Sequence, residues 1–449
     1  MSVAVIDRMS APVAVLPPTP RMPSLAQGLA FAFGRRRFVQ RLAKRHDSAF
    51  TLHLPLVGPL VFITDPQLAK QVFAFGPDDL GNVQPNLSEL LGSRSLLGLE
   101  GAEHRERRKL LAPSFHGRKI RDYSQIIEEE TLREIAGWPA GEAFPTFPSM
   151  TRITLNVILR TLLGAQGDDL DELRRVIPSF VALASRLTTL PVPPRTGGRF
   201  TPWGRLAVLR DQYEACLDRL IAAVQADPDF DNRSDMLSRL LRSRYEDGSA
   251  LSRKDIGDEM LTLLAAGHET TAVTLSWAFE RLSRHPAVLA AMADEADADG
   301  NRLRQATIRE VQRSRPALPM VGRRVRSAGV DVGDWVLPQG SSIAVAIAQI
   351  HTDPRLHPNP ERFDPQRFLG DSMPSNSWLP YGGGARRCLG SAFANLEMDI
   401  VLRTILRHYT IETTTLPGEK TNSRGLAFRP RDGGRIVVRR RAAVRQGAQ

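Results

Sequence analysis

The stretch Tyr381-Gly-Gly-Gly-Ala-Arg-Arg-Cys388-Leu-Gly390 places one of the two cysteines of the chain directly after a glycine-rich loop. From Phe393 onward apolar residues recur at helical spacing, so Cys388 is predicted to lie at or beside the N-terminus of a helix. Free N–H groups and the helix dipole favour an anion at such a position. The sequence therefore predicts that Cys388 is a thiolate, and hence either a nucleophile or a metal ligand.

The neighbours of Cys388 favour the metal ligand. Three consecutive glycines, 382–384, allow the backbone to approach something flat and bulky, and Arg386 offers a guanidinium fork that suits a carboxylate. A nucleophilic cysteine would need a histidine base, and none lies nearby in the sequence. These residues fit a haem, with its iron on the sulfur and a propionate on the arginine. A surface turn with a buried structural cysteine is the simpler alternative at this point.

The composition describes a globular protein of a reducing compartment. Among 449 residues, only Cys216 and Cys388 are cysteines, which excludes a disulfide framework, and the lack of a CxxC pair argues against structural zinc. No apolar run is long enough to span a membrane. The apolar segment Leu25 to Phe33 is short and is followed by three arginines rather than a cleavage site, so no secretory signal is predicted. We expect a cytoplasmic protein without a transmembrane anchor.

The net charge of +11 leaves three explanations open: binding of nucleic acid, docking of an acidic protein, or a solvated basic surface. The basic residues are spread along the chain, aromatic residues make up only 6%, and no nucleic-acid-binding motif is present. We therefore expect no nucleic-acid partner. The other two explanations stay open on charge alone.

The patterns along the chain predict a mainly α fold with small β-sheets. No repeat and no internal linker divides the chain, so we expect an extended, proline-rich lead-in over residues 1–20 and a single domain over 21–449. The expected elements are a β-hairpin over 51–64, helices over about 120–290, a proline- and glycine-rich loop over 190–204, strands after Arg313 and a meander over 351–381.

One predicted helix is unusually long. Ser252 and Asp255 have the spacing of a capping box, and Pro286 ends the helical pattern at His285. In its middle lies Ala265-Ala-Gly-His-Glu-Thr-Thr271, where a glycine, a carboxylate and two hydroxyls interrupt apolar neighbours. A groove with these groups and water suits proton delivery to a bound small molecule. The alternative is a kinked core helix with locally satisfied polar groups.

Together these segments resemble the cytochrome P-450 family of haem-thiolate monooxygenases. Five motifs occur in the order of the family: His104-Arg-Glu-Arg-Arg108, Ala266-Gly-His-Glu-Thr-Thr271, Glu310-Val-Gln-Arg313, Phe363-Asp-Pro-Gln-Arg-Phe368 and the stretch from Tyr381 to Gly390. The resemblance covers most of the chain. The short segment between Pro286 and Glu310 resembles soluble bacterial members.

The resemblance implies a single-domain cytochrome P-450 fold with haem b between the long helix and the cysteine loop, and molecular oxygen as co-substrate. It implies that Cys388 is the axial iron ligand and that Thr270 and Glu269 deliver protons. The implied cofactor-binding residues are Cys388, His104, Arg108, Arg323, Arg386, Tyr381, Gly267 and Gly390. It also implies a structural triad of Glu310, Arg313 and Arg367. Tyr381 stands where the family usually has phenylalanine, so its hydroxyl needs a partner.

For partners, the resemblance implies a monomer that receives electrons from a separate protein, because no flavin- or nicotinamide-binding region is recognised. Arg105, Arg107, Lys109 and Arg387 are expected to form a basic dock for an acidic ferredoxin. The substrate is expected to be an apolar small molecule, resembling a lipid, steroid or terpenoid. Its expected contacts are residues 81–98, 183–190, the helix near Ala265, and 317–321.

Two other functions stay open on the sequence. One is a peroxide-driven or isomerising member of the same family, against which Glu269 and Thr270 argue. The other is a basic nucleic-acid-binding or regulatory protein without catalysis.

Overall fold

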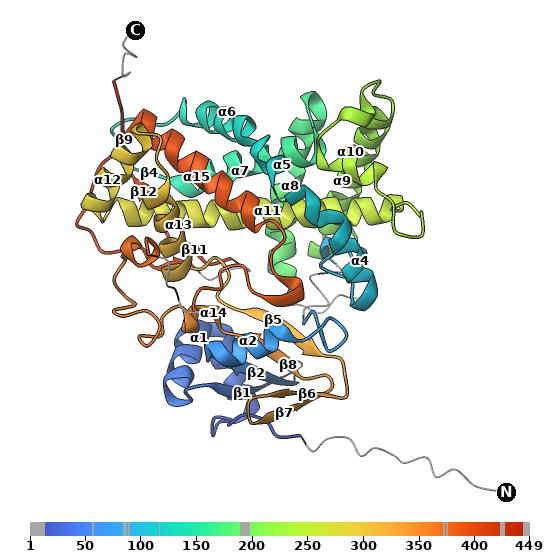
Figure 1. Cartoon of the computed structure of the whole chain (residues 1–449), viewed down its shortest axis with the longest axis vertical. Coiled ribbons are helices and arrows are strands. Elements are labelled where there is room, and N and C mark those ends of the chain that lie inside the picture. Colours follow the sequence, from blue (N-terminus) through green and yellow to red (C-terminus); the bar gives the residue numbers. More distant parts are fainter. Residues whose placement is uncertain are drawn as a thin grey trace, which may run out of the picture.

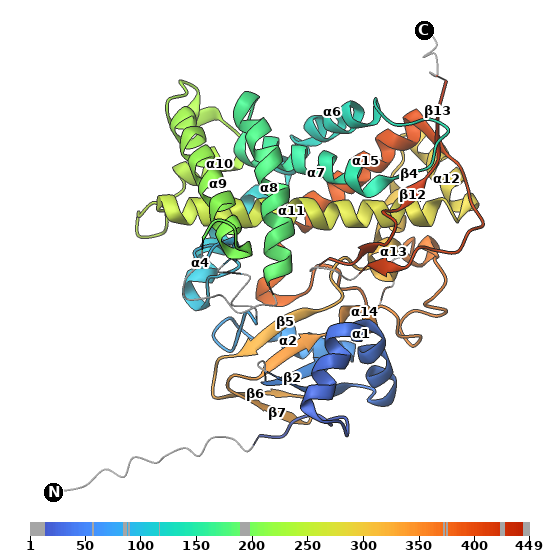
Figure 2. The same cartoon turned by 180° about the vertical axis from the view of Figure 1, so that it is seen from behind.

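The computed structural model describes residues 14–55, 58–83, 88, 90–115, 117–188, 198–370, 373, 376–422 and 427–442. Figures 1 and 2 show a large helix-rich part crossed by α11 and a smaller part that holds a five-stranded sheet with α1 and α2. The predicted mainly α fold with small sheets is confirmed. Among the described residues, no helix is both long enough and apolar enough to cross a bilayer.

The helices vary widely in length, and α11 is the longest. Their bounds are α1 Ser24–Arg45, α2 Pro66–Ala74, α4 Gly101–Leu111, α5 Arg118–Arg121, α6 Ser124–Ile135, α7 Thr146–Leu163, α8 Gly167–Leu187, α9 Pro202–Gln225, α10 Met236–Arg242, α11 Arg253–Leu282, α12 Pro286–Asp297, α13 Arg302–Ser314, α14 Ile347–Ile350 and α15 Ser391–His408.

Helix α11 begins at the predicted capping box. The backbone N–H of Asp255 donates to Ser252 Oγ at 3.1 Å, and the backbone N–H of Ser252 donates to Asp255 Oδ2 at 3.0 Å. The helix ends at Leu282, three residues before the predicted end at His285. It is buried along most of its length because helices pack around it, so every polar group on it must find a partner inside the protein.

The predicted loop over 190–204 is shorter than expected. Helix α9 already begins at Pro202, and Thr201 Oγ1 caps it by accepting the backbone N–H of Gly204 at 3.0 Å. Proline is compatible with the first turn of a helix, where its missing N–H has no intrahelical partner to lose. Residues 190–197 of the predicted loop lie outside the described residues.

The sheet has the strand order β1-β2-β8-β5-β3, and its first two strands form the predicted hairpin. The strand bounds are β1 Ala49–Leu54, β2 Gly58–Ile63, β3 Leu80–Gly81, β4 Phe144–Pro145, β5 Val321–Val325, β6 Gly329–Val332, β7 Trp335–Pro338, β8 Ser342–Val345, β9 Tyr409–Ile411, β10 Thr421–Asn422, β11 Arg429–Pro430, β12 Arg435–Ile436 and β13 Val438–Arg440. Strands therefore do follow Arg313, as predicted.

The described end of the lead-in is attached to this sheet. Val15 forms an antiparallel bridge with Val336 of β7, and the backbone N–H of Thr51 donates to Pro18 O at 2.9 Å. Residues 1–13 lie outside the described part of the chain.

The meander is anchored by the predicted pair on α13. Arg313 donates through Nε and Nη2 to both carboxylate oxygens of Glu310 at 2.7 and 2.8 Å, and both side chains are fully buried. The remaining Arg313 donors bind the backbone carbonyls of His351 and Pro360. Arg367 Nε lies 3.8 Å from Glu310 Oε1, which brings the third predicted member of the triad to the pair.

The side chain of Arg367 also binds backbone carbonyls of the meander. Its two terminal nitrogens donate to Pro358 O at 2.6 Å and Asn359 O at 2.9 Å. Both arginines thus hold main-chain oxygens in a segment that has little regular structure of its own.

Candidate functional site around Cys388

The cysteine loop folds back on itself before α15. The backbone N–H of Cys388 donates to Tyr381 O at 3.0 Å, and Gly390 precedes the first residue of α15, Ser391. The prediction that Cys388 lies beside a helix start is confirmed. The Cys388 side chain is exposed, so a ligand can reach the sulfur.

The helix start alone does not lower the pKa of the Cys388 thiol. Although the side chain is accessible, nearby protein atoms desolvate the sulfur and raise the pKa of the thiol, and this outweighs the hydrogen bond from the backbone of Gly390 and the charges of Arg108 and Arg387. A metal ion bound to the sulfur would deprotonate it outright. The anionic form therefore requires a bound cation rather than the helix start alone.

The glycines of the loop are needed for packing against α2. A Cβ on Gly383 would lie 2.5 Å from Phe73 Cδ2, and a Cβ on Gly384 would lie 2.1 Å from Phe73 O. Gly384 also has a φ of +67°, which side chains disfavour. Gly383 and Gly384 thus serve the packing of the loop against α2, and the expected approach of the glycine run to a flat cofactor stays a prediction.

The hydroxyl of Tyr381 has the partners that it needs. It donates to Asn395 Oδ1 at 2.7 Å and accepts from Gln312 Nε2 at 2.7 Å. Burial, with a smaller contribution from Cys388, raises the pKa of Tyr381 well above its usual value. The sequence contained both partners, since Gln312 lies inside the Glu310-Val-Gln-Arg313 motif and Asn395 lies on α15, but nothing in the sequence paired them with Tyr381.

A cluster of basic side chains meets at the N-terminal half of α4. The charges of Arg386, Arg108 and Arg323 act on His104 and, together with burial, lower its pKa to about 4. The three arginines predicted to contact the cofactor therefore lie near buried His104, which is predicted to contact it as well. Glu100 contributes a carboxylate to this cluster and pairs with Arg386 at 2.6 Å.

This basic cluster fits an acidic ligand. His104 Nδ1 and Arg386 Nε are buried and have no hydrogen-bond partner among the described residues. Burial and the charge of Arg386 lower the pKa of Arg323 to about 10, and the charge of Glu100 opposes this only in part. A ligand with two carboxylates, such as haem, would supply the missing negative charge and acceptors.

The middle of α11 contains the other predicted group of site residues. Thr270 Oγ1 donates to Ala266 O at 2.8 Å, so this hydroxyl is satisfied within its own helix, as the alternative of locally satisfied polar groups expects. Ala266 is exposed although it lies in the middle of a buried helix. Glu269 makes no hydrogen bond within the described part of the chain, and burial raises the pKa of its carboxyl.

Gly267 has a packing role on the opposite side of this segment. A Cβ on Gly267 would lie 2.0 Å from Ile158 Cδ1 of α7. The glycine thus lets α7 approach α11 closely, and the structure brings its Cα toward that helix. A direct contact between Gly267 and the cofactor remains a prediction.

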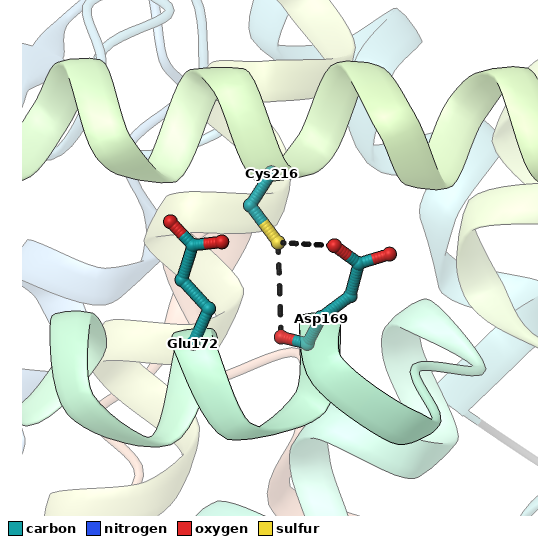
Figure 3. A group of neighbouring side chains, drawn as sticks. All are labelled: Asp169, Glu172 and Cys216. Carbon is teal, nitrogen blue, oxygen red and sulfur yellow. Dashed lines mark hydrogen bonds between the residues drawn. The ribbon is translucent and has the colours of Figure 1, made fainter.

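The second cysteine lies in a different environment. Figure 3 shows Cys216 of α9 between Asp169 and Glu172 of α8, and its Sγ lies 3.6 Å from Asp169 Oδ1. Burial and the neighbouring Asp169 raise the pKa of the Cys216 thiol to about 12. The guanidinium of Arg219 already pairs with both carboxylates. This group therefore neither forms a thiolate nor offers free ligands to a metal ion.

Arg107 is not a surface residue, so its assignment to the basic dock is wrong. Its side chain is 1% exposed and forms ion pairs with Glu259 at 3.2 Å and Asp255 at 3.0 Å, both on α11. Its Nε also donates to Tyr245 Oη at 2.9 Å. Sequence reasoning missed this buried network because its members lie more than a hundred residues apart.

The other members of the predicted dock are exposed. Arg105 pairs with Asp78 at 2.8 Å, Lys109 pairs with Glu246 at 3.3 Å, and Arg387 is exposed on the cysteine loop. Lys70 of α2 lines a surface groove together with Arg387 and Tyr381. The sequence did not single out Lys70.

Comparisons with known proteins agree with this geometry. A family model described as cytochrome P-450 matches residues 17–434. The putative cytochrome P-450 138 of Mycobacterium tuberculosis is 57% identical over 441 residues, which cover 98% of this chain and 100% of the relative. The putative cytochrome P-450 135B1 of the same organism is 40% identical over 434 residues, covering 94% of this chain and 91% of the relative.

A solved structure is similar over the same range. The retinoic acid-bound cyanobacterial CYP120A1 superposes with a TM-score of 0.83 at 26% identity, covering 96% of this chain and 100% of that protein. The family model and the relatives span nearly the whole sequence. The chain therefore belongs to the cytochrome P-450 family and is a haem-dependent monooxygenase.

Proposed function

We propose that this monooxygenase inserts one oxygen atom of O2 into an apolar small molecule and that Cys388 is the axial ligand of its haem b. The observation that carries the proposal is the accessible Cys388 sulfur on a loop that Arg108 also binds, through Arg387 O at 2.8 Å. His104, Arg108, Arg323 and Arg386 would hold the propionates. When bound, the haem supplies oxygen activation, which a thiolate ligand favours.

The role of the protein at the opposite side would be proton delivery. The hydroxyl of Thr270 donates to Ala266 O, and on turning away from that carbonyl it would donate its proton to a bound group and accept one from a water molecule. Burial raises the pKa of the Glu269 carboxyl, which makes it easier for this group to hold a proton and pass it on. Both side chains come from one turn of α11.

The experiment for the ligand compares the two cysteines. In the reduced, carbon monoxide-bound protein, the strongly red-shifted Soret band should be lost in Cys388→Ser and kept in Cys216→Ser. A red-shifted band in Cys388→Ser would contradict the proposal. The band in the unaltered protein would also separate the proposal from a non-catalytic regulatory protein.

The experiment for proton delivery compares two neighbouring threonines. Thr270→Ala should increase the peroxide released per electron consumed, because the proton needed for productive turnover arrives more slowly. Thr271→Ala is the matched control, since Thr271 is buried and its hydroxyl only donates to Gly267 O at 3.2 Å. Equal peroxide release by the two variants would exclude the role of Thr270.

For the substrate we propose an apolar molecule of lipid, steroid or terpenoid type. The segments expected around it are largely apolar, and the similar cyanobacterial protein carries retinoic acid, an isoprenoid. Spin-state shifts of the haem on titration with such compounds would test this class. Shifts produced only by small polar compounds would contradict it.

For the electron donor we propose an acidic ferredoxin-type protein on the outer face of the cysteine loop. The support is the exposed set of Arg105, Lys109, Arg387 and Lys70, from which buried Arg107 is removed. Lys70→Glu combined with Arg387→Glu should slow reduction by the ferredoxin in a salt-dependent way. Arg205→Glu, an exposed site on α9, is the control. Equal rates in all three proteins would exclude the dock.

A further inference from the structure

Helix α1 presents an apolar strip to solvent. Leu25, Leu29 and Phe33 are 66%, 53% and 89% exposed, and their spacing of four residues places them along one side of the helix. Among the described residues, nine large hydrophobic side chains are exposed, and five of them lie between Val15 and Phe33. Three of these side chains lie on α1 and two just before it, so more than half of them are found at this end of the described chain.

The second half of the same helix is strongly basic. It contains Arg35, Arg36, Arg37, Arg41, Lys44 and Arg45, and α1 contains no acidic residue, so this helix carries six positive charges of the net +11. Arg37, Arg41, Lys44 and Arg45 are exposed, and they form no ion pair with any residue that the structure describes. A backbone kink at Gly34, with φ −138° and ψ 26°, separates the apolar half from the basic half.

We propose that α1 docks the protein on the surface of an anionic lipid bilayer. Exposed leucine and phenylalanine side chains next to unpaired arginines are the features of a helix that lies in a membrane interface. Leu25, Leu29 and Phe33 carry no polar side-chain group, so the strip offers no hydrogen bonds that would select a specific partner. The acyl-chain region of a bilayer is apolar and makes no hydrogen bonds, so it suits the strip, while lipid phosphates would bind the arginines.

The charge pattern disfavours a second copy of this chain as the occupant. Two copies that met through the strip would bring two sets of six positive charges close together, which repel. The Leu25 to Phe33 segment, which the sequence excluded as a secretory signal, thereby gains a role that does not require it to cross the membrane.

The experiment is co-sedimentation of the full-length holoprotein with vesicles. Binding is expected to vesicles of mixed phosphatidylcholine and phosphatidylglycerol, to weaken with salt, and to be far lower for pure phosphatidylcholine. Leu25→Ser, Leu29→Ser and Phe33→Ser combined should weaken binding by about tenfold or more, because three exposed apolar side chains lose their burial in lipid. Arg37→Glu with Arg41→Glu should have an effect of about that size.

The matched control is Leu132→Ser on α6. Leu132 is 38% exposed, and Figures 1 and 2 place α6 at the opposite end of the molecule from α1. The carbon monoxide spectrum must be unchanged in every variant, which shows that each still folds around haem. No binding to anionic vesicles, or equal binding by the strip variant, would overturn the proposal. So would a dimer in solution that the strip variant abolishes, because the strip would then be a protein interface.

Discussion

Arg107 of α4 and Glu259 of α11 form an ion pair in which Nη1 lies 3.2 Å from Oε2 and each side chain is 1% exposed. The same Glu259 oxygen accepts the backbone N–H of Leu96 at 2.9 Å, and Arg107 Nη1 donates to Arg94 O at 2.9 Å. The pair thus joins α4, α11 and the segment around Leu96, which belongs to the range expected to contact substrate.

Replacement of Arg107 should destabilise the protein strongly. Arg107→Ala leaves the buried carboxylate of Glu259 without its cation, and the free energy of unfolding should fall by about 3–5 kcal/mol. Arg105→Ala is the control, because Arg105 is half exposed and its pair with Asp78 should contribute less than about 1 kcal/mol. Denaturant unfolding of both variants measures the difference, and equal losses would contradict the burial of Arg107.

The same carboxyl predicts a dependence of stability on pH. Burial raises the pKa of Glu259 from 4.5 to about 7, and Arg107 only partly opposes it. Between these pH values the folded protein keeps a proton that the unfolded chain releases, so stability should decrease as pH rises through this window and level off above it.

The comparison of Glu259→Gln with the unaltered protein isolates this effect. As pH rises from roughly 4.5 to 7, the unaltered protein should lose up to about 1.4 kcal/mol of unfolding free energy per pH unit relative to Glu259→Gln. Parallel stability profiles of the two proteins would show that Glu259 titrates normally.

Removal of the Tyr381 hydroxyl should cost stability although it restores the residue usual in the family. In Tyr381→Phe, Asn395 and Gln312 lose a buried partner, and unfolding should become easier by about 1–3 kcal/mol. Asn395→Leu combined with Tyr381→Phe should cost less than the sum of the single changes. Additive losses would mean that the hydroxyl and the amide do not interact.

The close approach of α7 and α11 predicts how Gly267→Ala changes the stability of the protein. In an open helix Gly→Ala stabilises by about 1 kcal/mol. Gly267→Ala should lose most of that gain, because its Cβ would overlap Ile158 Cδ1, the flexible end of a side chain that must then shift. Ile158→Val removes that atom, so in that background Gly267→Ala should stabilise by the full helix value. Gly370→Ala, which lies outside the helices and where a Cβ meets nothing within 4 Å, is the control for an added methyl group without overlap.

Local patterns were sufficient for much of the fold. Three predicted features depend on neighbours within a few residues, and all three are present: the capping box at Ser252, the hairpin of β1 and β2, and the pair of Glu310 with Arg313. The structure has the mainly α fold that the patterns predict, and the family model matches the family that the motifs indicate.

Properties that depend on tertiary packing could not be predicted. Arg105 and Arg107 look alike in the sequence, yet only Arg107 meets carboxylates from a helix about 150 residues away. The raised pKa of Cys388 follows from desolvation by surrounding protein, and the glycines before it face Phe73 of a distant helix. None of these neighbours leaves a signal in the local pattern.

The arginine clamp on the meander has a consequence for how this protein can change over generations. Arg313 and Arg367 bind main-chain oxygens of Pro360, Pro358 and Asn359, which every amino acid possesses. These contacts therefore do not depend on the identity of the side chains that they hold, although the φ of +51° at Asn359 favours asparagine or glycine at that position. The two arginines, whose side chains make the contacts, should tolerate substitution far less than the positions whose backbone they bind.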